Sequence, residues 1–260
     1  MASTQRGLMI SVSRNKYGIC FEDVIFCNDP EYYTPRHALA HFSQAKKSLP
    51  GFEARTTPII NLKGDLGVTF CNLSSNTRYK IRRAEREGVT GIFTPSPSDG
   101  DLMRFTEHFN KFATQKRLPA ANRDKLSKLS LGKNLTIIEA QDKDGKVIVS
   151  HAYIADQDSS RARLLYSASH YREVSDTEER NYIGRANRFL HWFEIQEFAR
   201  YGYEFYDLGG IPVSTENHQK NEIARFKAEF GGEVVTEYTG YVSNHPLIKI
   251  SIPAMKKIFA

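Results

Sequence analysis

The first candidates for proton transfer are two histidines and one aspartate that fall within or at the ends of strand-like segments. His151 lies in a predicted strand over residues 146–156, and His170 ends the next strand pattern. Histidine titrates near neutrality and therefore suits a general base, although strand histidines are more often ordinary core or surface residues. Asp207 ends a short aromatic strand, where it would either accept an amine proton or cap the turn at Gly209-Gly210.

A glycine-containing segment, Asn181 to Ala186, precedes an aromatic-rich helical pattern. We expect it to be a loop whose backbone N–H groups meet the start of that helix, where anions bind. Gly184 would let the backbone approach a ligand closely, while Arg185 and Arg188 would add positive charge. A glycine before a helix is common, so this pattern alone is weak evidence.

A second cluster of positive charge lies on a predicted helix over residues 75–88. Arg78, Arg82 and Arg86 recur four residues apart and therefore form one stripe. The stripe would either be a solvated helix face or a clamp for phosphate or carboxylate, which the arginine fork fits well.

Composition sets the class of protein. The chain has 260 residues, a formal charge of +6 and only three cysteines, Cys20, Cys27 and Cys71, with no metal-binding spacing. We therefore expect structural thiols in a reducing cytoplasm, no metal site, and an anionic partner. The sequence has no run of apolar residues long enough to cross a membrane.

The elements that would position these side chains follow one another in a recognisable order. Alternating patterns and a DKDG turn at 142–145 predict an antiparallel hairpin with a third strand after it. The long helix, the short strand 203–208, a helix at 217–230 and a strand at 233–241 come next. Nearer the N-terminus we expect two strands between Leu8 and Cys27 and a helix at 37–47, and at the C-terminus a closing helix at 248–258.

This order, together with the segments NTRYKIRRAEREGV, Asn181 to Ala186, ARYGYEFYDLGGI and FKAEFGGE, resembles the FemABX-like branch of the GNAT acyltransferase fold. The resemblance covers residues 57–241. It implies an α+β fold with a mixed, mostly antiparallel sheet flanked by helices. It also implies a partial N-terminal lobe or extension at 1–56 and an acyltransferase domain at 57–260.

The resemblance further implies where substrates bind. The donor would pair with the exposed edge of the strand that contains Val149 and place its phosphates on Asn181, Gly184, Arg185 and Ala186. Lys227 in FKAEFGG, with Arg78 and Arg82, would lie near acceptor or donor charge. No covalently bound cofactor is implied.

Three functions remain open at this point. The first is an N-acyltransferase that uses an acyl-CoA-type thioester and a small amine acceptor, such as an amino sugar or amino acid. The second is an aminoacyl-tRNA-dependent transferase that forms an amide in a cell-wall or small-peptide pathway. The third is a non-catalytic module that binds RNA or a partner. The sequence favours the first narrowly and leaves the oligomeric state unknown.

Overall fold

The computed structural model describes residues 9–16, 18–169, 176–211 and 218–245. The chain divides into two compact units, and each is described by itself. The first unit comprises Met1–Thr57 together with Val234–Ala260, and the second comprises Pro58–Glu233. The predicted helix at 248–258 lies outside the described residues.

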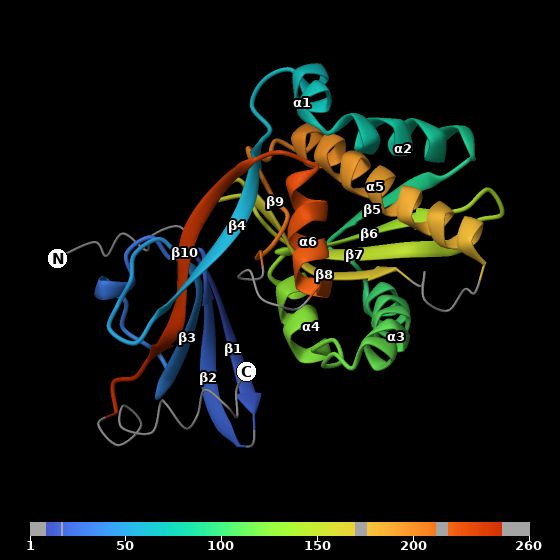
Figure 1. The fold of residues 1–260 in the computed structure, drawn as a ribbon. Helices are drawn as coiled ribbons and strands as arrows, with labels where there is room; N and C mark the ends of the chain where they lie inside the picture. The colour runs from blue at the N-terminus through green and yellow to red at the C-terminus, as the bar shows by residue number, and fades with distance from the viewer. Residues whose placement is uncertain (1–8, 17, 170–175, 212–217, 246–260) are drawn as a thin grey trace. The chain divides into compact units, whose positions relative to one another are not determined.

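Strands and helices follow one another along the described part of the chain in groups of one to three (Figure 1). The strands are β1 (Ile10–Lys16), β2 (Ile19–Ile25), β3 (Leu39–Ala45), β4 (Glu53–Asn61), β5 (Thr90–Pro95), β6 (Leu135–Gln141), β7 (Val147–Asp156), β8 (Arg161–Ser169), β9 (Phe205–Asp207) and β10 (Glu233–Val242). The helices are η1 (Pro30–Tyr32), α1 (Leu66–Asn72), α2 (Ser75–Arg86), α3 (Asp99–Lys116), α4 (Arg123–Leu131), α5 (Thr177–Arg200) and α6 (His218–Ala228).

In the first unit, β1 pairs antiparallel with β2, β2 parallel with β3, and β3 antiparallel with β10. Its core includes Val24 and Phe42. The predicted hairpin between Leu8 and Cys27 is confirmed, whereas the helix expected at 37–47 is wrong, because this segment is strand β3. Its partners on both sides supply backbone hydrogen bonds that the local sequence does not reveal.

The second unit is built on a sheet with the order β4-β9-β8-β7-β6-β5. All neighbours in it are antiparallel except β8 and β9, which run parallel. The predicted hairpin is β6 and β7, and its DKDG turn is closed by a hydrogen bond from the Asp142 N–H to the Lys146 carbonyl, 3.0 Å. The third strand, β8, follows as expected, and the predicted α+β architecture, with a mixed, mostly antiparallel sheet flanked by helices, is confirmed.

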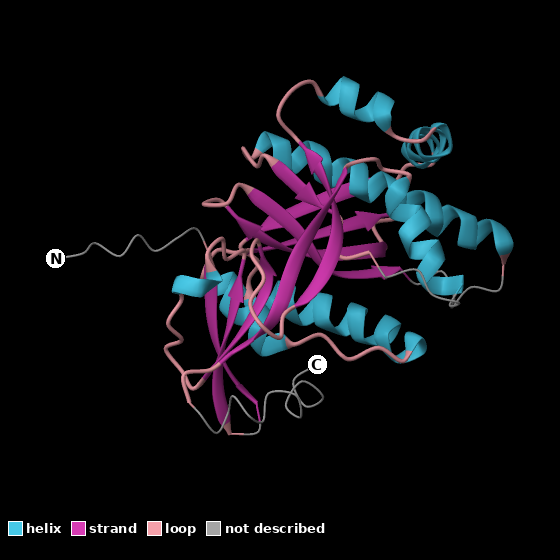
Figure 2. Cartoon of the chain, turned by 60° about the vertical axis from the view of Figure 1, so that its left-hand side comes forward, coloured by secondary structure: helices cyan, strands magenta, loops and turns pink. Residues whose placement is uncertain are grey.

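Helices cover both faces of this sheet. In the second unit, Figure 1 places α5 and α2 on one side of β5 to β8 and α3 and α4 on the other, and Figure 2 shows strands lying between helices. Apolar side chains of α5, among them Leu190, Ile195 and Phe198, are fully buried in the core between α5 and the sheet. Helix α5 is therefore the element that fixes the side chains on that face of the sheet.

Helix α2 ends before Gly88 as its sequence predicts, but its N-cap is Ser74 and not Ser75 or Asn76. The Ser74 hydroxyl accepts the Thr77 N–H at 3.1 Å, and Gly88, just after the helix, has a φ of 82°. Such left-handed backbone favours glycine and stops a helix at a defined residue. Local signals therefore set the bounds of α2.

Candidate active site

A pocket of about 360 Å³ lies between α5, α6 and the end of β8. It is lined by Ser169 of β8, by Arg180, Ile183, Gly184, Asn187 and Arg188 of α5, and by Glu222, Arg225, Phe226 and Glu229 of α6. Its size is in the range of small-molecule sites, roughly 300–1,000 Å³.

The pocket is rich in arginine. Arg180 and Arg225 are exposed, while Arg188 is held in place by Glu229, with 2.7 Å between Nη2 and Oε2. Three guanidinium groups face two carboxylates, so the lining carries a net positive charge. Arginine binds phosphate oxygens in a bidentate manner, and the pocket therefore suits a phosphate-bearing ligand.

Strand β8 leads into this pocket along an open edge. β9 pairs with β8 only from Arg161 to Arg163. From Leu164 to Ser169, β8 keeps β7 on one side, and no strand in the described part of the chain pairs with its other side. Backbone N–H and C=O groups along this stretch can therefore pair with an extended ligand.

Asp207 at the end of β9 is fully buried and fixed in place. The Arg161 Nε donates to its Oδ2 at 3.1 Å, and the Gly209 N–H donates to its Oδ1 at 2.8 Å. This bonding matches the turn-capping role that the sequence left open. A direct catalytic role for Asp207 stays a prediction, and it requires the substrate to reach a side chain that has no exposed surface.

Lys227 of α6 lies beside the same turn. Its Nζ donates to the carbonyl oxygens of Gly209 at 2.9 Å and Gly210 at 2.8 Å. Burial and the nearby Arg163 guanidinium lower the Lys227 pKa to about 8, although Asp207 opposes that shift. An ammonium group has three donors, so one N–H remains for a substrate oxygen.

A buried polar network lies behind the pocket. His151 Nδ1 is 2.7 Å from Glu194 Oε1, and His151 Nε2 is 3.1 Å from the Oδ1 of Asn187, which lines the pocket. The Tyr153 and Tyr206 hydroxyls both donate to Glu194 Oε2, at 2.6 and 2.7 Å. Every polar group of Glu194 is thus bonded inside the protein.

His191 completes this network, with its Nδ1 2.6 Å from the Tyr206 hydroxyl and 3.1 Å from Glu194 Oε2. Burial lowers the His191 pKa to about 4, although Glu194 opposes the shift. Burial alone would raise the Glu194 pKa, but the charge and hydrogen bonds of His151 and His191 lower it to about 2. The carboxylate is therefore ionised at neutral pH.

Three groups of this network also have the chemistry of metal ligands. His151, His191 and Glu194 bring their ligand atoms within 4.8 Å of one another. The Nδ1 atom of His151 lies 2.7 Å from a Glu194 oxygen, and the Nδ1 atom of His191 lies 2.6 Å from the Tyr206 hydroxyl. These distances are those of hydrogen bonds within one network. The expectation of no metal site stays a prediction.

His151, the first candidate for a general base, is thus part of a buried network. It has no exposed surface, and it reaches the pocket only through Asn187. A catalytic role for His151 stays a prediction, and in this geometry it would act by positioning Asn187. His170 lies outside the described residues.

The expected donor loop is wrong, because Asn181 to Ala186 lies inside α5, which begins at Thr177. The cap is Asp176, whose side chain accepts the Glu179 N–H at 3.0 Å. The N–H groups at 181–186 are used within the helix and cannot bind phosphate. Gly184 lines the pocket, whereas Ala186 is buried in the core.

Arg185 and Val149 are also placed differently from the expectation. Arg185 points to the end of α2, where its Nε is 2.8 Å from Oε2 of Glu87, the residue that follows the helix. Val149 lies in a strand paired on both edges, opposite Ala140 of β6 and Ser169 of β8. The prediction that a donor pairs with this strand is wrong, because both of its edges are occupied.

The arginines of α2 have contacts of their own. Arg78 Nη1 donates to the Leu73 carbonyl at 2.9 Å, at the end of α1. The Arg82 guanidinium lies over the Phe70 ring, 5.3 Å from its centroid. Neither lines the arginine-rich pocket, and their binding of substrate stays a prediction.

Sequence reasoning missed Glu194 and Asn187. They lie seven residues, about two helical turns, apart on a helix with an apolar stripe, where a buried carboxylate is rare. A glutamate between Trp192 and Ile195 on the buried face was the available signal.

Comparisons with known proteins agree on the fold. No protein-family model matches the chain, and no curated sequence matches it. FemX is 11% identical, with a TM-score of 0.63 over 93% of this chain and 85% of its own. L-PGS from Bacillus licheniformis is 15% identical, with a TM-score of 0.55 over 97% and 86%.

The C-terminal domain of a protein described as a lysylphosphatidylglycerol synthetase, from Agrobacterium fabrum, is also 15% identical, with a TM-score of 0.54 over 95% and 84%. The expected resemblance to the FemABX-like branch of the GNAT fold is thereby confirmed at the level of structure. Within the described residues, no helix combines the length and apolar character needed to cross a bilayer.

Proposed function

We propose that the protein is an acyltransferase that forms an amide between a phosphate-bearing acyl donor and an amine. The observation that carries this proposal is the arginine-rich pocket at the end of the open edge of β8. The pocket would hold the donor's phosphates, and the edge would hold the extended part next to the reactive carbonyl.

In this proposal the amine nitrogen attacks the acyl carbon, and the carbonyl oxygen takes up the electron pair. The third N–H of Lys227 stabilises that oxygen, because the ammonium is already oriented by the Gly209 and Gly210 carbonyls. When the tetrahedral intermediate collapses, the bond to the leaving group breaks and the amine proton leaves with that group. Lys227 thus stabilises charge without changing protonation.

The start of α5 favours one of the two donors that the sequence left open. Asp176, Glu178 and Glu179 place carboxylates there, and the Asp176 side chain occupies the Glu179 N–H. These charges disfavour a pyrophosphate at the helix start. We therefore place an aminoacyl-tRNA first, since its phosphates can meet the exposed arginines, Arg180 and Arg225, instead.

The structures with TM-scores above 0.5 are consistent with placing an aminoacyl-tRNA first, since one is FemX and another is described as a lysylphosphatidylglycerol synthetase. An acyl-CoA-type thioester is the second candidate. The open edge of β8 favours it, because a pantetheine arm carries amides that can pair with such an edge. The acceptor is a small amine in either case.

Equilibrium binding of unfractionated tRNA and of CoA tests the pocket. Arg180→Gln and Arg225→Gln should each weaken tRNA binding several-fold and reduce its salt dependence, because each removes one phosphate contact. Arg200→Gln is the matched control, at the exposed opposite end of the same helix.

Binding of CoA without binding of tRNA would reverse the ranking and make an acyl-CoA-type thioester the first candidate for the donor. If both arginine variants bind each ligand as the wild type does, the pocket is not the donor site.

A further inference from the structure

A second pocket of about 480 Å³ lies on the opposite face of the same sheet, where α3 passes over β5, β6 and β7. Asp101, Arg104, His108 and Lys111 come from one face of α3, at helical spacing, and form its wall. Ile92, Ile137 and Val147 contribute apolar side chains from three strands to its floor. The proposed donor pocket shares none of these residues.

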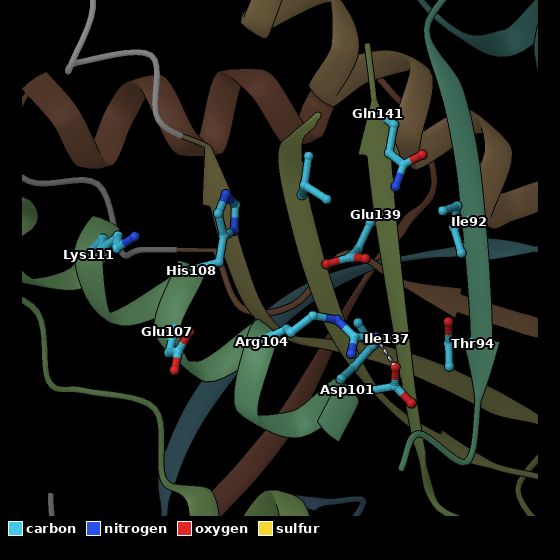
Figure 3. Close-up of a pocket in the computed structure, with 11 residues that line it drawn as sticks. Ile92, Thr94, Asp101, Arg104, Glu107, His108, Lys111, Ile137, Glu139 and Gln141 are labelled. Carbon is cyan, nitrogen blue, oxygen red and sulfur yellow. Dashed lines mark hydrogen bonds and ion pairs between the residues drawn. The ribbon is translucent and has the colours of Figure 1, made fainter. Parts of the chain in front are cut away.

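A carboxylic acid stands in the middle of that floor. Glu139 on β6 pairs with Ile92 of β5 and faces the hollow, as Figure 3 shows. No hydrogen bond or ion pair links its carboxyl group to the described residues. Burial raises the Glu139 pKa, opposed by Arg104 and assisted by Asp101. A half-buried carboxyl group without a partner is costly unless a ligand pairs with it.

Arg104 lies beside Glu139 in Figure 3 but is paired elsewhere. Its Nη2 donates to Asp101 Oδ1, and the other oxygen of Asp101 accepts the Ser98 N–H at 2.8 Å. Asp101 is itself held by the capping box of α3. The arginine is thus fixed near Glu139 without neutralising it, and its remaining N–H groups stay available.

The hollow therefore presents a negative group and a positive group side by side above an apolar floor. The ligand that complements this arrangement carries an ammonium next to a carboxylate, together with an apolar side chain. We propose that this pocket binds a free apolar α-amino acid, with its ammonium on Glu139, its carboxylate on Arg104, and its side chain against Ile92, Ile137 and Val147.

The chemistry of the lining narrows the ligand further. A simple amine would leave the remaining N–H groups of Arg104 without an acceptor, and a simple carboxylate would meet Glu139 with a like charge. A residue within a peptide carries neither free group. A free amino acid satisfies both groups. The pocket shares no residue with the proposed donor pocket, so this proposal does not depend on acyl transfer.

Titration calorimetry on the full chain at pH 7.5 tests the proposal with L-leucine, L-valine and L-methionine as probes. For L-leucine, 3-methylbutylamine and 4-methylpentanoate are the matched compounds that lack the carboxylate and the amine. We expect an amino acid to bind at least tenfold more tightly than either fragment.

Glu139→Gln and Arg104→Gln should each weaken amino-acid binding at least tenfold. Glu85→Gln is the control for charge, because it removes an exposed carboxylate on α2, outside the pocket. Melting temperatures of all three variants report whether the fold is kept. Neither pocket variant should change tRNA or CoA binding, which separates this proposal from the acyltransferase one.

Three results would overturn the proposal: no binding by any of the three amino acids, equal affinity for L-leucine and 3-methylbutylamine, or unchanged affinity in Glu139→Gln.

Discussion

Replacing Glu194 by glutamine should destabilise the second unit more than any single charge change at the surface. The carboxylate accepts hydrogen bonds from the Tyr153 and Tyr206 hydroxyls at 2.6 and 2.7 Å and lies 2.7 Å from His151 Nδ1. Glutamine keeps the shape and one acceptor oxygen but puts an NH₂ group where the other oxygen was. At least one of these contacts must then be lost or reversed.

The magnitude follows from the burial of the group. Removing one partner of a buried, hydrogen-bonded ion pair costs on the order of 3–5 kcal/mol. Because glutamine retains one acceptor, we expect the lower end, about 3 kcal/mol. In a chain of this size each kcal/mol lowers the melting temperature by roughly 2–4 °C, so the expected fall is about 6–12 °C.

Thermal unfolding followed by circular dichroism at pH 7.5 measures this effect. Glu197→Gln is the control, since Glu197 is one turn along the same helix and pairs with the largely exposed Arg200. That surface pair is worth at most about 1 kcal/mol. A Glu194→Gln melting temperature within 2 °C of the control would refute the view that Glu194 holds the network together.

Three further predictions concern other parts of the second unit. Burial lowers the pKa of His191 to about 4 in the folded protein, so as pH falls His191 is protonated in the unfolded chain before it is protonated in the folded one. The wild type should therefore lose stability as pH falls from about 6.5 toward 4. His191→Phe should make that slope shallower in urea unfolding, and an unchanged slope would exclude His191 as its source. The pKa of Glu139 is raised, so its contribution to stability is lost as pH rises through the folded-state pKa. Glu139→Gln should therefore melt higher than the wild type at pH 8 but not at pH 4, and a difference independent of pH would contradict this. Gly232 has a φ of 98°, and a Cβ there would lie 2.9 Å from the Ile59 carbonyl oxygen. Gly232→Ala should lower the free energy of unfolding by on the order of 1–3 kcal/mol. The control, Gly145→Ala, should cost less, because a Cβ there would meet nothing within 4 Å. Equal losses of stability in chemical denaturation would count against a close contact at Gly232.

Local signals in the sequence were enough for the elements that depend on local physics. The hairpin of β6 and β7 follows from alternation and a turn with Gly145 at a positive φ, 81°. Helix α2 follows from its caps. The start of α5 also had a local signal, since Asp176 and Glu179 have the spacing of a capping box. The expectation of a loop at 181–186 gave more weight to Gly184 than to that signal.

Non-local pairing could not be read from the sequence. Whether β8 has an open edge depends on β9, a three-residue strand that pairs with β4 and β8 from distant parts of the chain. The setting of Glu194 depends on Tyr153 and Tyr206, which lie 41 and 12 residues away. The residue types of the candidate site were therefore visible in the sequence, but their partners were not.

The central claim is acyl transfer to an amine, and a transfer assay tests it most directly. The protein is incubated with tRNA charged with radiolabelled amino acids, and in parallel with labelled acetyl-CoA, using glycinamide and glucosamine as amine acceptors. Ester- or thioester-linked label is released by mild base, whereas amide-linked label is not.

The account predicts protein-dependent, base-stable label from the charged tRNA. Lys227→Met should lower kcat at least 100-fold while tRNA binding is kept, because the ammonium acts on the developing oxyanion. Base-stable label from acetyl-CoA alone would support acyl transfer but identify an acyl-CoA, and not an aminoacyl-tRNA, as the donor. No base-stable label from either donor, with wild-type protein that binds both, would contradict the account.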